Sequence, residues 1–326
     1  MLSRSAQGLY WIGRYLKRAE HISRLMEQQI AALVDRPLSH IYFGWARLYS
    51  HLRVSSPVAA LRDWSKEADG WGLADSFTLA DDLTFTRSNE YSICSCFEMG
   101  RENARQIRHC VSSEMWICLN RSYQHMRDQH IEDIWATDPQ QFYADVVQDV
   151  NTFMGVASAT LYRDEGWEFL QIGRMIEHAQ LMCSLLVFQT TESSEEKYGD
   201  LENYDWSSLL HCFQADEAYQ HYFGLNIQAS NVLNMLVTDK KLPNSVYFSL
   251  EQIGNRLNEL GDAPGKRNGA TANRFAGRLT SVLNYEWPDA EDKKRMIVLL
   301  ENLSMRLHEY ISSAWFNYEI DDTARI

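Results

Sequence analysis

The sequence predicts an all-α protein, a bundle of roughly ten or more helices. Helix-breaking residues are scarce. The chain has 6 Pro and 16 Gly, which is 22 of 326 residues or about 7%, whereas average usage of the two together is roughly 12%. Apolar residues recur at intervals of three and four over long stretches, and no sustained alternation typical of strands is evident. A hydrophobic content of 45% and a charged content of 23% are those of a folded globular chain that buries a large core.

The first predicted helix covers residues 3–34. Its apolar stripe at three- and four-residue spacing is formed by Leu9, Ile12, Leu16, Ala19, Ile22 and Leu25. Pro37 ends this helix and Pro57 opens a new segment. A Trp-rich connection follows, which contains Trp64, Gly70, Trp71 and Gly72.

The rest of the first half is predicted to be helical over 88–120 and from Pro139 to about residue 162. We expect a break at Ser112-Ser113, because a serine there can cap the next helix. Asp138-Pro139 is typical of a helix cap and first turn, since proline has no amide hydrogen to lose at that position.

In the second half, a strongly apolar helix is predicted over 165–189, followed by an exposed acidic, Ser-rich linker at 190–203. Helical spacing continues over 206–237 and 246–260, and Leu242-Pro243-Asn244-Ser245 separates the two as a stop and a new cap. The Gly-rich stretch 261–269 reads as a loop whose Gly-Lys pair lacks the spacing of a phosphate-binding loop. Two closing helices are expected over about 272–285 and 289–318.

An internal repeat links the two halves. Ile12-Gly13-Arg14 and Ala19 match Ile172-Gly173-Arg174 and Ala179 at a constant offset of 160. We interpret the match as a duplicated helical unit, so that one domain over 1–326 contains related sub-lobes at 1–162 and 163–326; chance convergence of apolar helices is the alternative. A glycine inside a helix costs about 1 kcal/mol relative to alanine, so Gly13 and Gly173 predict a close helix crossing.

Three sets of arginine and glutamate residues recur at helical spacing. We take as candidate ligand-binding residues Arg14, Arg18, Glu20, Arg101, Glu102, Arg105, Arg108, Glu114, Arg174 and Glu177, with Trp11 and Trp116 as candidate pocket walls. Three interpretations stay open: a structural network between helices, a solvated face worth little to stability, or a site for an anion or carboxylate.

These residues carry a family resemblance. The sequence resembles the alpha-E domain family in three ordered motifs, Leu9-Tyr10-Trp11-Ile12-Gly13-Arg14-Tyr15-x-x-Arg18-Ala19-Glu20, Glu102-Asn103-Ala104-Arg105-x-x-Arg108 with Ser113-Glu114-x-Trp116, and Phe169-Leu170-x-Ile172-Gly173-Arg174-x-x-Glu177. The resemblance covers nearly the whole chain and implies a bacterial all-helical domain named for its Glu-Arg motifs. It departs at Lys17, where the family usually has Glu, and at His178, where it usually has Arg.

The resemblance implies a functional context more than a reaction. Alpha-E proteins are encoded with, or fused to, circularly permuted ATP-grasp amide ligases, often beside transglutaminase-like peptidases. We therefore expect a non-catalytic partner of such a ligase in the synthesis or modification of a peptide or amide-linked product. Two alternatives stay open: an enzyme half-site in which Glu102, Glu114 or Glu177 acts as a base, and a structural scaffold that forms homo-oligomers through aromatic helices.

Several other functions are not expected. With 44 acidic and 31 basic residues the net charge is −13, which argues against binding to nucleic acid or an anionic membrane. No apolar run is long enough to span a bilayer and no signal peptide is evident, so we expect a cytoplasmic protein. The six cysteines lack zinc-site spacing and no Glu-x-x-His pair occurs, so we expect no metal and no cofactor.

Overall fold

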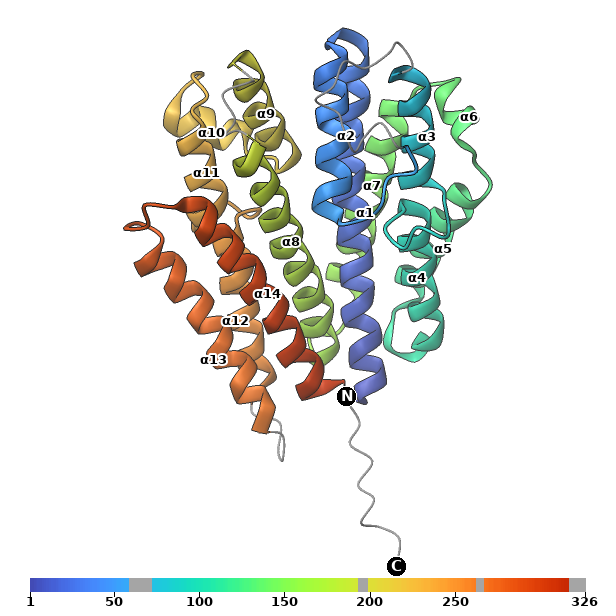
Figure 1. The fold of residues 1–326 in the computed structure, drawn as a ribbon. Helices are drawn as coiled ribbons and strands as arrows, with labels where there is room; N and C mark the ends of the chain where they lie inside the picture. Colours follow the sequence, from blue (N-terminus) through green and yellow to red (C-terminus); the bar gives the residue numbers. More distant parts are fainter. Residues whose placement is uncertain (59–71, 193–198, 262–266, 317–326) are drawn as a thin grey trace, which may run out of the picture.

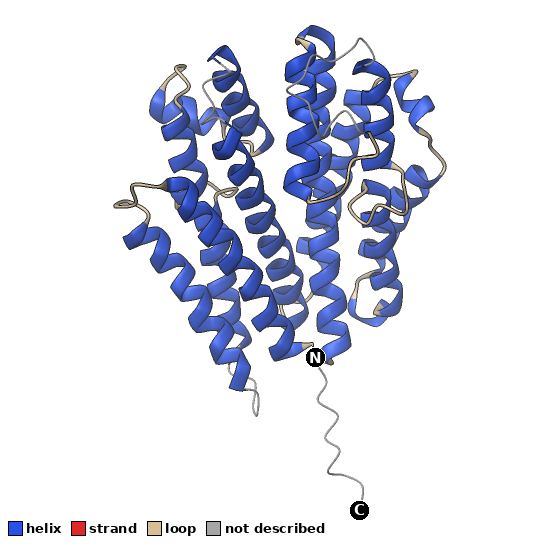
Figure 2. Ribbon diagram, in the orientation of Figure 1, coloured by secondary structure: helices blue, strands red, loops and turns tan. Residues whose placement is uncertain are grey.

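The computed structural model describes residues 1–58, 72–192, 199–261 and 267–316. Within these ranges the chain forms fourteen α-helices and no strand (Figure 2). The all-α, multi-helix prediction is therefore confirmed. The expected Trp-rich connection with Trp64 and Trp71, the middle of the acidic linker and most of the Gly-rich stretch lie outside the described residues.

The first half of the chain contains seven helices. They are α1 (Ser3–Asp35), α2 (Leu38–Leu52), α3 (Gly72–Thr84), α4 (Ile93–Gln106), α5 (Ser113–Arg127), α6 (Ile131–Trp135) and α7 (Pro139–Thr160), with a 3-10 turn at Arg108–Cys110. Side-chain caps fix several starts: the Ser112 hydroxyl accepts from the Met115 amide at 3.1 Å and Asp138 accepts from the Gln141 amide at 3.1 Å.

The second half also contains seven helices. They are α8 (Glu165–Glu192), α9 (Gly199–Cys212), α10 (Asp216–Phe223), α11 (Ala229–Thr238), α12 (Val246–Leu260), α13 (Arg267–Ser281) and α14 (Lys293–Trp315), with a π-helical turn at Val282–Glu286. Ser245 caps α12 by accepting from the Phe248 amide at 2.9 Å, and Asp292 caps α14 by accepting from the Arg295 amide at 2.9 Å.

Several predicted boundaries were wrong, among them the loop expected at 261–269, because α13 already begins at Arg267. The helical stretch expected over 206–237 is divided into α9, α10 and α11, because Gln214 and Gly224 adopt left-handed backbone conformations with φ of 53° and 76°. The linker expected at 190–203 is shorter, since α8 continues to Glu192 and α9 begins at Gly199. The helix expected from residue 88 begins at Ile93, after the cap of Ser92.

The helices α1 and α8 form the centre of the molecule and pack on each other more extensively than any other pair (Figure 1). They run in the same direction, from the bottom of that view to the top. Helices α4 and α7 flank α1, with α5 against both; α12 and α14 flank α8, with α13 against both. The packing scheme of the first half thus recurs in the second.

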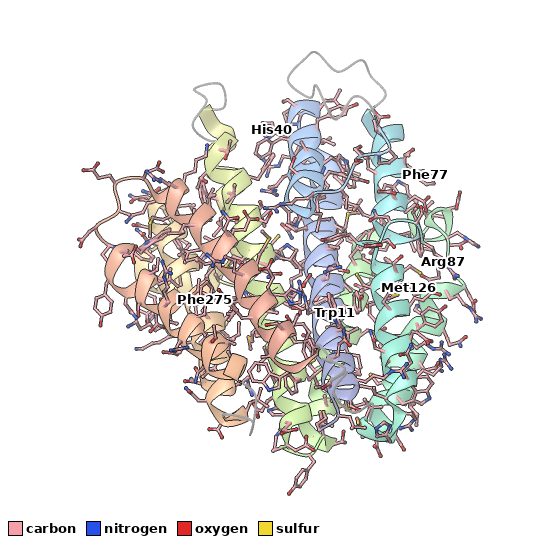
Figure 3. The ribbon with its side chains drawn as sticks, turned by 60° about the horizontal axis from the view of Figure 1, so that its bottom comes forward. Trp11, His40, Phe77, Arg87, Met126 and Phe275 are labelled. Carbon is pink, nitrogen blue, oxygen red and sulfur yellow. The ribbon has the colours of Figure 1, made fainter. Side chains whose placement is uncertain are left out.

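Figure 3 shows how the flanks lie about this centre: Trp11 of α1 is in the middle, Phe275 of α13 on one side and Met126 of α5 on the other.

Two helix glycines allow the close packing of α1 and α8. A Cβ atom on Gly13 would overlap the carbonyl oxygen of Leu170, and one on Gly173 would overlap the carbonyl oxygen of Tyr10. Leu170 follows Tyr10 by 160 positions, as Gly173 follows Gly13, so the two contacts are reciprocal. The helix pair therefore has an approximate twofold relation, with the axis along the helices, that exchanges residue i of α1 with residue i + 160 of α8.

Candidate functional site: ionic clusters at the central helix pair

Two arginines of α1 share one buried carboxylate of α8. Arg14 donates from Nε to Glu177 Oε2 at 2.5 Å, and Arg18 donates from Nε to Glu177 Oε1 at 2.6 Å. A terminal amino group of Arg14, Nη2, also donates to Gln180 Oε1 at 2.8 Å. All three ion-paired side chains are buried, with Glu177 only 2% exposed. We call Arg14, Arg18, Glu177 and Gln180 the Arg14 cluster.

The Arg14 cluster is held in its charged form. Burial alone would raise the pKa of Glu177, but the two guanidinium groups outweigh it and lower that pKa to about 2. Aromatic rings complete the packing: the guanidinium carbon of Arg14 lies 4.8 Å from the ring centre of Trp11, and that of Arg18 lies 4.3 Å from that of Tyr91. Two arginines against one carboxylate leave one positive charge in excess.

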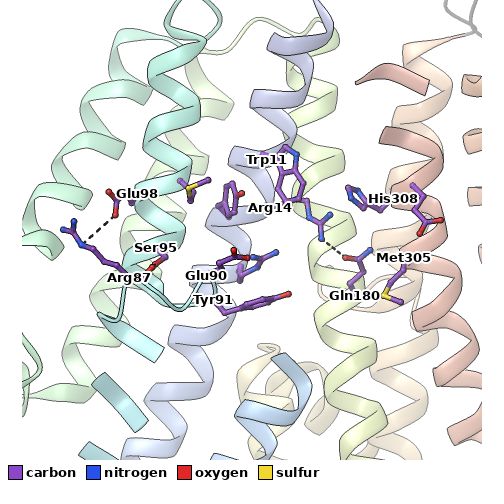
Figure 4. A pocket seen from close by; sticks show the side chains of 14 residues that line it. Trp11, Arg14, Arg87, Glu90, Tyr91, Ser95, Glu98, Gln180, Met305 and His308 are labelled. Carbon is purple, nitrogen blue, oxygen red and sulfur yellow. Dashed lines mark hydrogen bonds and ion pairs between the residues drawn. The ribbon is translucent and has the colours of Figure 1, made fainter. Parts of the chain in front are cut away.

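A cavity of about 640 Å³ opens beside this cluster. The lining from α1 consists of Trp11, Arg14, Tyr15 and Arg18. Gln180 of α8 also lines the cavity, and Figure 4 shows its hydrogen bond with Arg14. The remaining lining comes from the segment before and within α4 and from α14: Arg87, Glu90, Tyr91, Ser95, Glu98, Met99, Met305, His308 and Glu309. The volume is that of a small-molecule pocket.

Arg18 is the side chain best placed to meet a ligand in this pocket. Only its Nε is engaged by a protein acceptor among the described residues, so both terminal amino groups are available to the pocket that the residue lines. His308, which also lines the cavity, is neutral near pH 7, because burial first and then the charge of Arg14 lower its pKa to about 4. The part of the lining that α1 contributes is therefore cationic, through Arg14 and Arg18, and aromatic, through Trp11 and Tyr15.

A second ionic cluster lies on the other face of the α1–α8 pair. Lys17 donates to Glu20 Oε2 at 3.2 Å and Arg24 donates to Glu20 Oε1 at 3.2 Å. His178 Nε2 donates to the carbonyl oxygen of Asn244 at 3.1 Å, which ties α8 to the start of α12. Arg174 is half-buried beside these groups, and its charge acts on both Lys17 and Glu20. We call Lys17, Glu20, Arg24, Arg174 and His178 the Arg174 cluster.

The structure does not gather the ten candidate residues into one site. Arg14, Arg18 and Glu177 meet in one cluster, while Glu20 and Arg174 belong to the other. The remaining five, from the second motif, lie apart on α4, α5 and the turn between them: Arg101, Glu102, Arg105, Arg108 and Glu114. Of the two candidate pocket walls, Trp11 lines the cavity.

The second motif forms its own surface arrangement. Arg105 is exposed and makes two hydrogen bonds to Glu102, at 2.7 and 2.8 Å. Trp116 lies near Arg101 and Arg108, with ring-centre distances of 5.5 and 5.8 Å. Arg101 is tied to α5 by a 2.7 Å hydrogen bond to Asn120, and Glu114 is exposed in the first turn of α5. These contacts lie within α4 or between α4, the following turn and α5, and none of the five residues lines the cavity.

Sequence reasoning missed most of the pocket lining. Gln180 had a detectable signal, since it lies three residues after Glu177 on the same helix. Tyr15 likewise follows Trp11 by one turn of α1. Tyr91, Met305 and His308 had none, because they come from a loop and a helix whose placement against α1 depends on tertiary packing.

The described residues show no group of three or more His, Cys, Asp or Glu able to hold a metal ion. All six cysteines are free, and only Cys110 is partly exposed. In the part of the chain that the structure describes, no helix is both long and apolar enough to cross a bilayer.

Comparison with known proteins places the chain in a family. The Alpha-E family model, described as a predicted alpha-helical domain with a conserved ER motif, matches residues 1–316. Uncharacterized proteins of Mycobacterium bovis and Mycobacterium tuberculosis are 23% identical over 296 residues, which is 86% of this chain and 32% of theirs. The chain thus spans about a third of the length of these relatives. No solved structure matches it. The match over nearly the whole chain shows that this protein belongs to the Alpha-E family.

Proposed function

We propose that this protein is a non-catalytic helical partner of a circularly permuted ATP-grasp amide ligase, and that its pocket holds a carboxylate or phosphate group of the ligase's substrate or product. The observation that carries the binding role is the Arg14 cluster. Glu177 fixes both arginines through their Nε atoms, so the terminal amino groups of Arg18 are pre-positioned towards the cavity. A preorganised guanidinium loses little freedom when it binds an oxyanion.

Two findings support a partner: the family to which the chain belongs, and the greater length of its mycobacterial relatives. In the mycobacterial relatives the matching region is about a third of a longer chain, so an Alpha-E region is joined there to other parts of a protein. A transglutaminase-like peptidase is a second partner that the family resemblance suggests.

The geometry favours binding over catalysis by this chain. The pKa of Glu177, lowered to about 2, makes it a weak base near neutral pH. Glu102 and Glu114 lie outside the cavity lining, and hydrogen bonds from Arg105 lower the pKa of Glu102 to about 2. A general base needs a pKa nearer the working pH and a place beside the reacting atoms.

Binding can be tested by calorimetry on the full chain with glutarate and with inorganic phosphate as probes. We expect at least one probe to bind, Arg18→Gln to weaken it at least tenfold, and Arg18→Lys to restore it only in part, because an ammonium lacks the planar fork. Arg105→Gln is the matched control, since it removes an exposed arginine outside the pocket. Equal binding by Arg18→Gln and the wild type would exclude this pocket.

The partner is tested by co-purification with a circularly permuted ATP-grasp ligase from the same genome. We expect a stable complex or a change in ligase turnover when this protein is added. If the ligase neither binds nor responds, the partner role is wrong even where calorimetry shows a ligand. A purely structural role predicts instead that Arg14→Ala and Arg174→Ala unfold the protein, which circular dichroism would reveal.

A further inference from the structure

We propose that the Arg174 cluster is a second anion-binding site, one that takes a phosphate group. It lies on the opposite face of the α1–α8 pair from the cavity, and it does not depend on what the cavity binds. The two clusters correspond position by position under the twofold relation of the helix pair.

Four positions correspond at the offset of 160. Arg174 corresponds to Arg14, and Glu20 corresponds to Gln180. Three of the pairs differ in charge: Glu20 is a carboxylate where Gln180 is neutral, Lys17 stands at the equivalent of Glu177, and His178 stands at the equivalent of Arg18. The carboxylate that joins two arginines on the first face is therefore replaced by an ammonium group on the second. Arg174 has no built-in carboxylate of the kind that holds Arg14.

The charges of the Arg174 cluster do not balance. Lys17, Arg24 and Arg174 are cations, and Glu20 is the carboxylate that faces them. Both oxygens of Glu20 are already engaged, one by Lys17 and one by Arg24. Among the described residues Arg174 has no hydrogen-bond acceptor or ion-pair partner. Two positive charges in excess at a largely buried place are costly unless an anion neutralises them.

His178 gives an independent sign of a ligand. It is 3% exposed, and its Nδ1 atom is buried without a hydrogen-bond partner among the described residues. Because Nε2 faces a carbonyl oxygen, the proton belongs on Nε2 and Nδ1 is an acceptor. A carboxylate offers no donor to such an atom. A hydrogen phosphate or a singly protonated phosphate ester offers both anionic oxygens for the cations and a hydroxyl for Nδ1.

The two cations of the Arg174 cluster that belong to corresponding positions differ in burial: Arg174 is half-buried, whereas Lys17 lies deeper at 6% exposure. A phosphate that first meets Arg174 can therefore be shared with the Lys17 ammonium, in the bridging role that Glu177 has between Arg14 and Arg18.

The test uses calorimetry and thermal unfolding of the full chain in inorganic phosphate and in glycerol 3-phosphate, each against chloride at matched ionic strength. All variants carry Arg18→Gln, which weakens binding in the cavity equally in each of them. We expect this background to bind phosphate and Arg174→Gln to lower the affinity at least tenfold. Binding of the free ion alone assigns the site to inorganic phosphate, and binding of both assigns it to a phosphoryl group in general.

Lys17→Glu is the sharper variant, because it restores a carboxylate at the position equivalent to Glu177. We expect it to raise the melting temperature in chloride and to abolish the response to phosphate. Lys241→Glu makes the same charge change at an exposed position and should leave the response unchanged. Phosphate binding that survives Arg174→Gln, or no phosphate binding by the Arg18→Gln background, overturns the proposal. If Lys17→Glu does not fold, the Arg174→Gln comparison alone decides.

Discussion

The two faces of the α1–α8 pair share one backbone frame, and three of the four corresponding positions in their ionic clusters carry different side chains. On one face two arginines close on the Glu177 carboxylate beside a cavity; on the other, Lys17 takes the equivalent position and Glu20 alone opposes three cations. A repeated helix crossing thus sets where charges can meet, while single residues decide how many of them are paired within the protein. With Glu177 on one face and Lys17 at the equivalent position on the other, the first cluster has one cation in excess and the second has two.

The largest expected effect is the loss of the shared carboxylate. Glu177→Gln leaves two buried guanidinium groups without their counter-ion, and we expect it to lower the free energy of unfolding by about 3–5 kcal/mol. Glu20→Gln should cost less, about 1–3 kcal/mol, because Arg24 is partly exposed and burial already lowers the pKa of Lys17 to about 8. Chemical denaturation at pH 7 measures both. Equal losses would mean that the two clusters are energetically alike.

A second prediction concerns the crossing on which both faces depend. Gly13→Ala places a methyl group against the Leu170 carbonyl oxygen, and we expect a loss of about 3 kcal/mol as α1 and α8 are forced apart. Gly173→Ala should behave the same way because the contact is reciprocal. Gly277→Ala, in α13, meets no atom within 4 Å and should stabilise by about 0.5–1 kcal/mol. A mild effect at Gly13 with unchanged thermal unfolding would contradict the close crossing.

A third prediction concerns the buried histidines and acid. Burial, aided by the charge of Lys17, lowers the pKa of His178 to about 3; burial lowers that of His51 to about 4 and that of His21 well below 6.5. These rings stay neutral in the folded protein but bind protons when unfolded, so their stabilisation is complete above pH 6.5 and is lost as the pH falls towards 4. Each contributes about 1.4 kcal/mol per pH unit in that window.

His178→Gln removes one of these three groups. Between pH 6.5 and 5 the free energy of unfolding of this variant should fall less steeply than that of the wild type. The two slopes should differ by about 1.4 kcal/mol per pH unit, which corresponds to one bound proton. Denaturant titrations at several pH values give the slope. Parallel curves for the two proteins would show that His178 is not held neutral.

The smallest effect is expected at the exposed pair of the second motif. Arg105→Ala breaks two hydrogen bonds to Glu102, yet both side chains are solvated and the melting temperature should not change measurably. A clear drop in melting temperature would show that the Arg105–Glu102 pair on α4 stabilises the fold as the central clusters do.

Much of the fold could be predicted because helices are local. Three- and four-residue spacing and the caps at Ser112, Asp138 and Ser245 placed several helices to within a few residues. The helices α2, α3 and α6 were not anticipated. Helix α2 is buried along most of its length, so no single apolar stripe marks it. Helix α6 is only five residues long.

The sequence by itself determined the helical class, the position of the two helix glycines and the recurrence of an Ile-Gly-Arg motif 160 residues apart. It also showed which arginines and glutamates share a face of one helix. Only the tertiary structure decided that Glu177 meets Arg14 and Arg18 while Arg105 stays at the surface with Glu102. The reason is physical: side-chain spacing fixes direction around one helix axis, but the rotation and separation of two helices depend on the packing of the whole core.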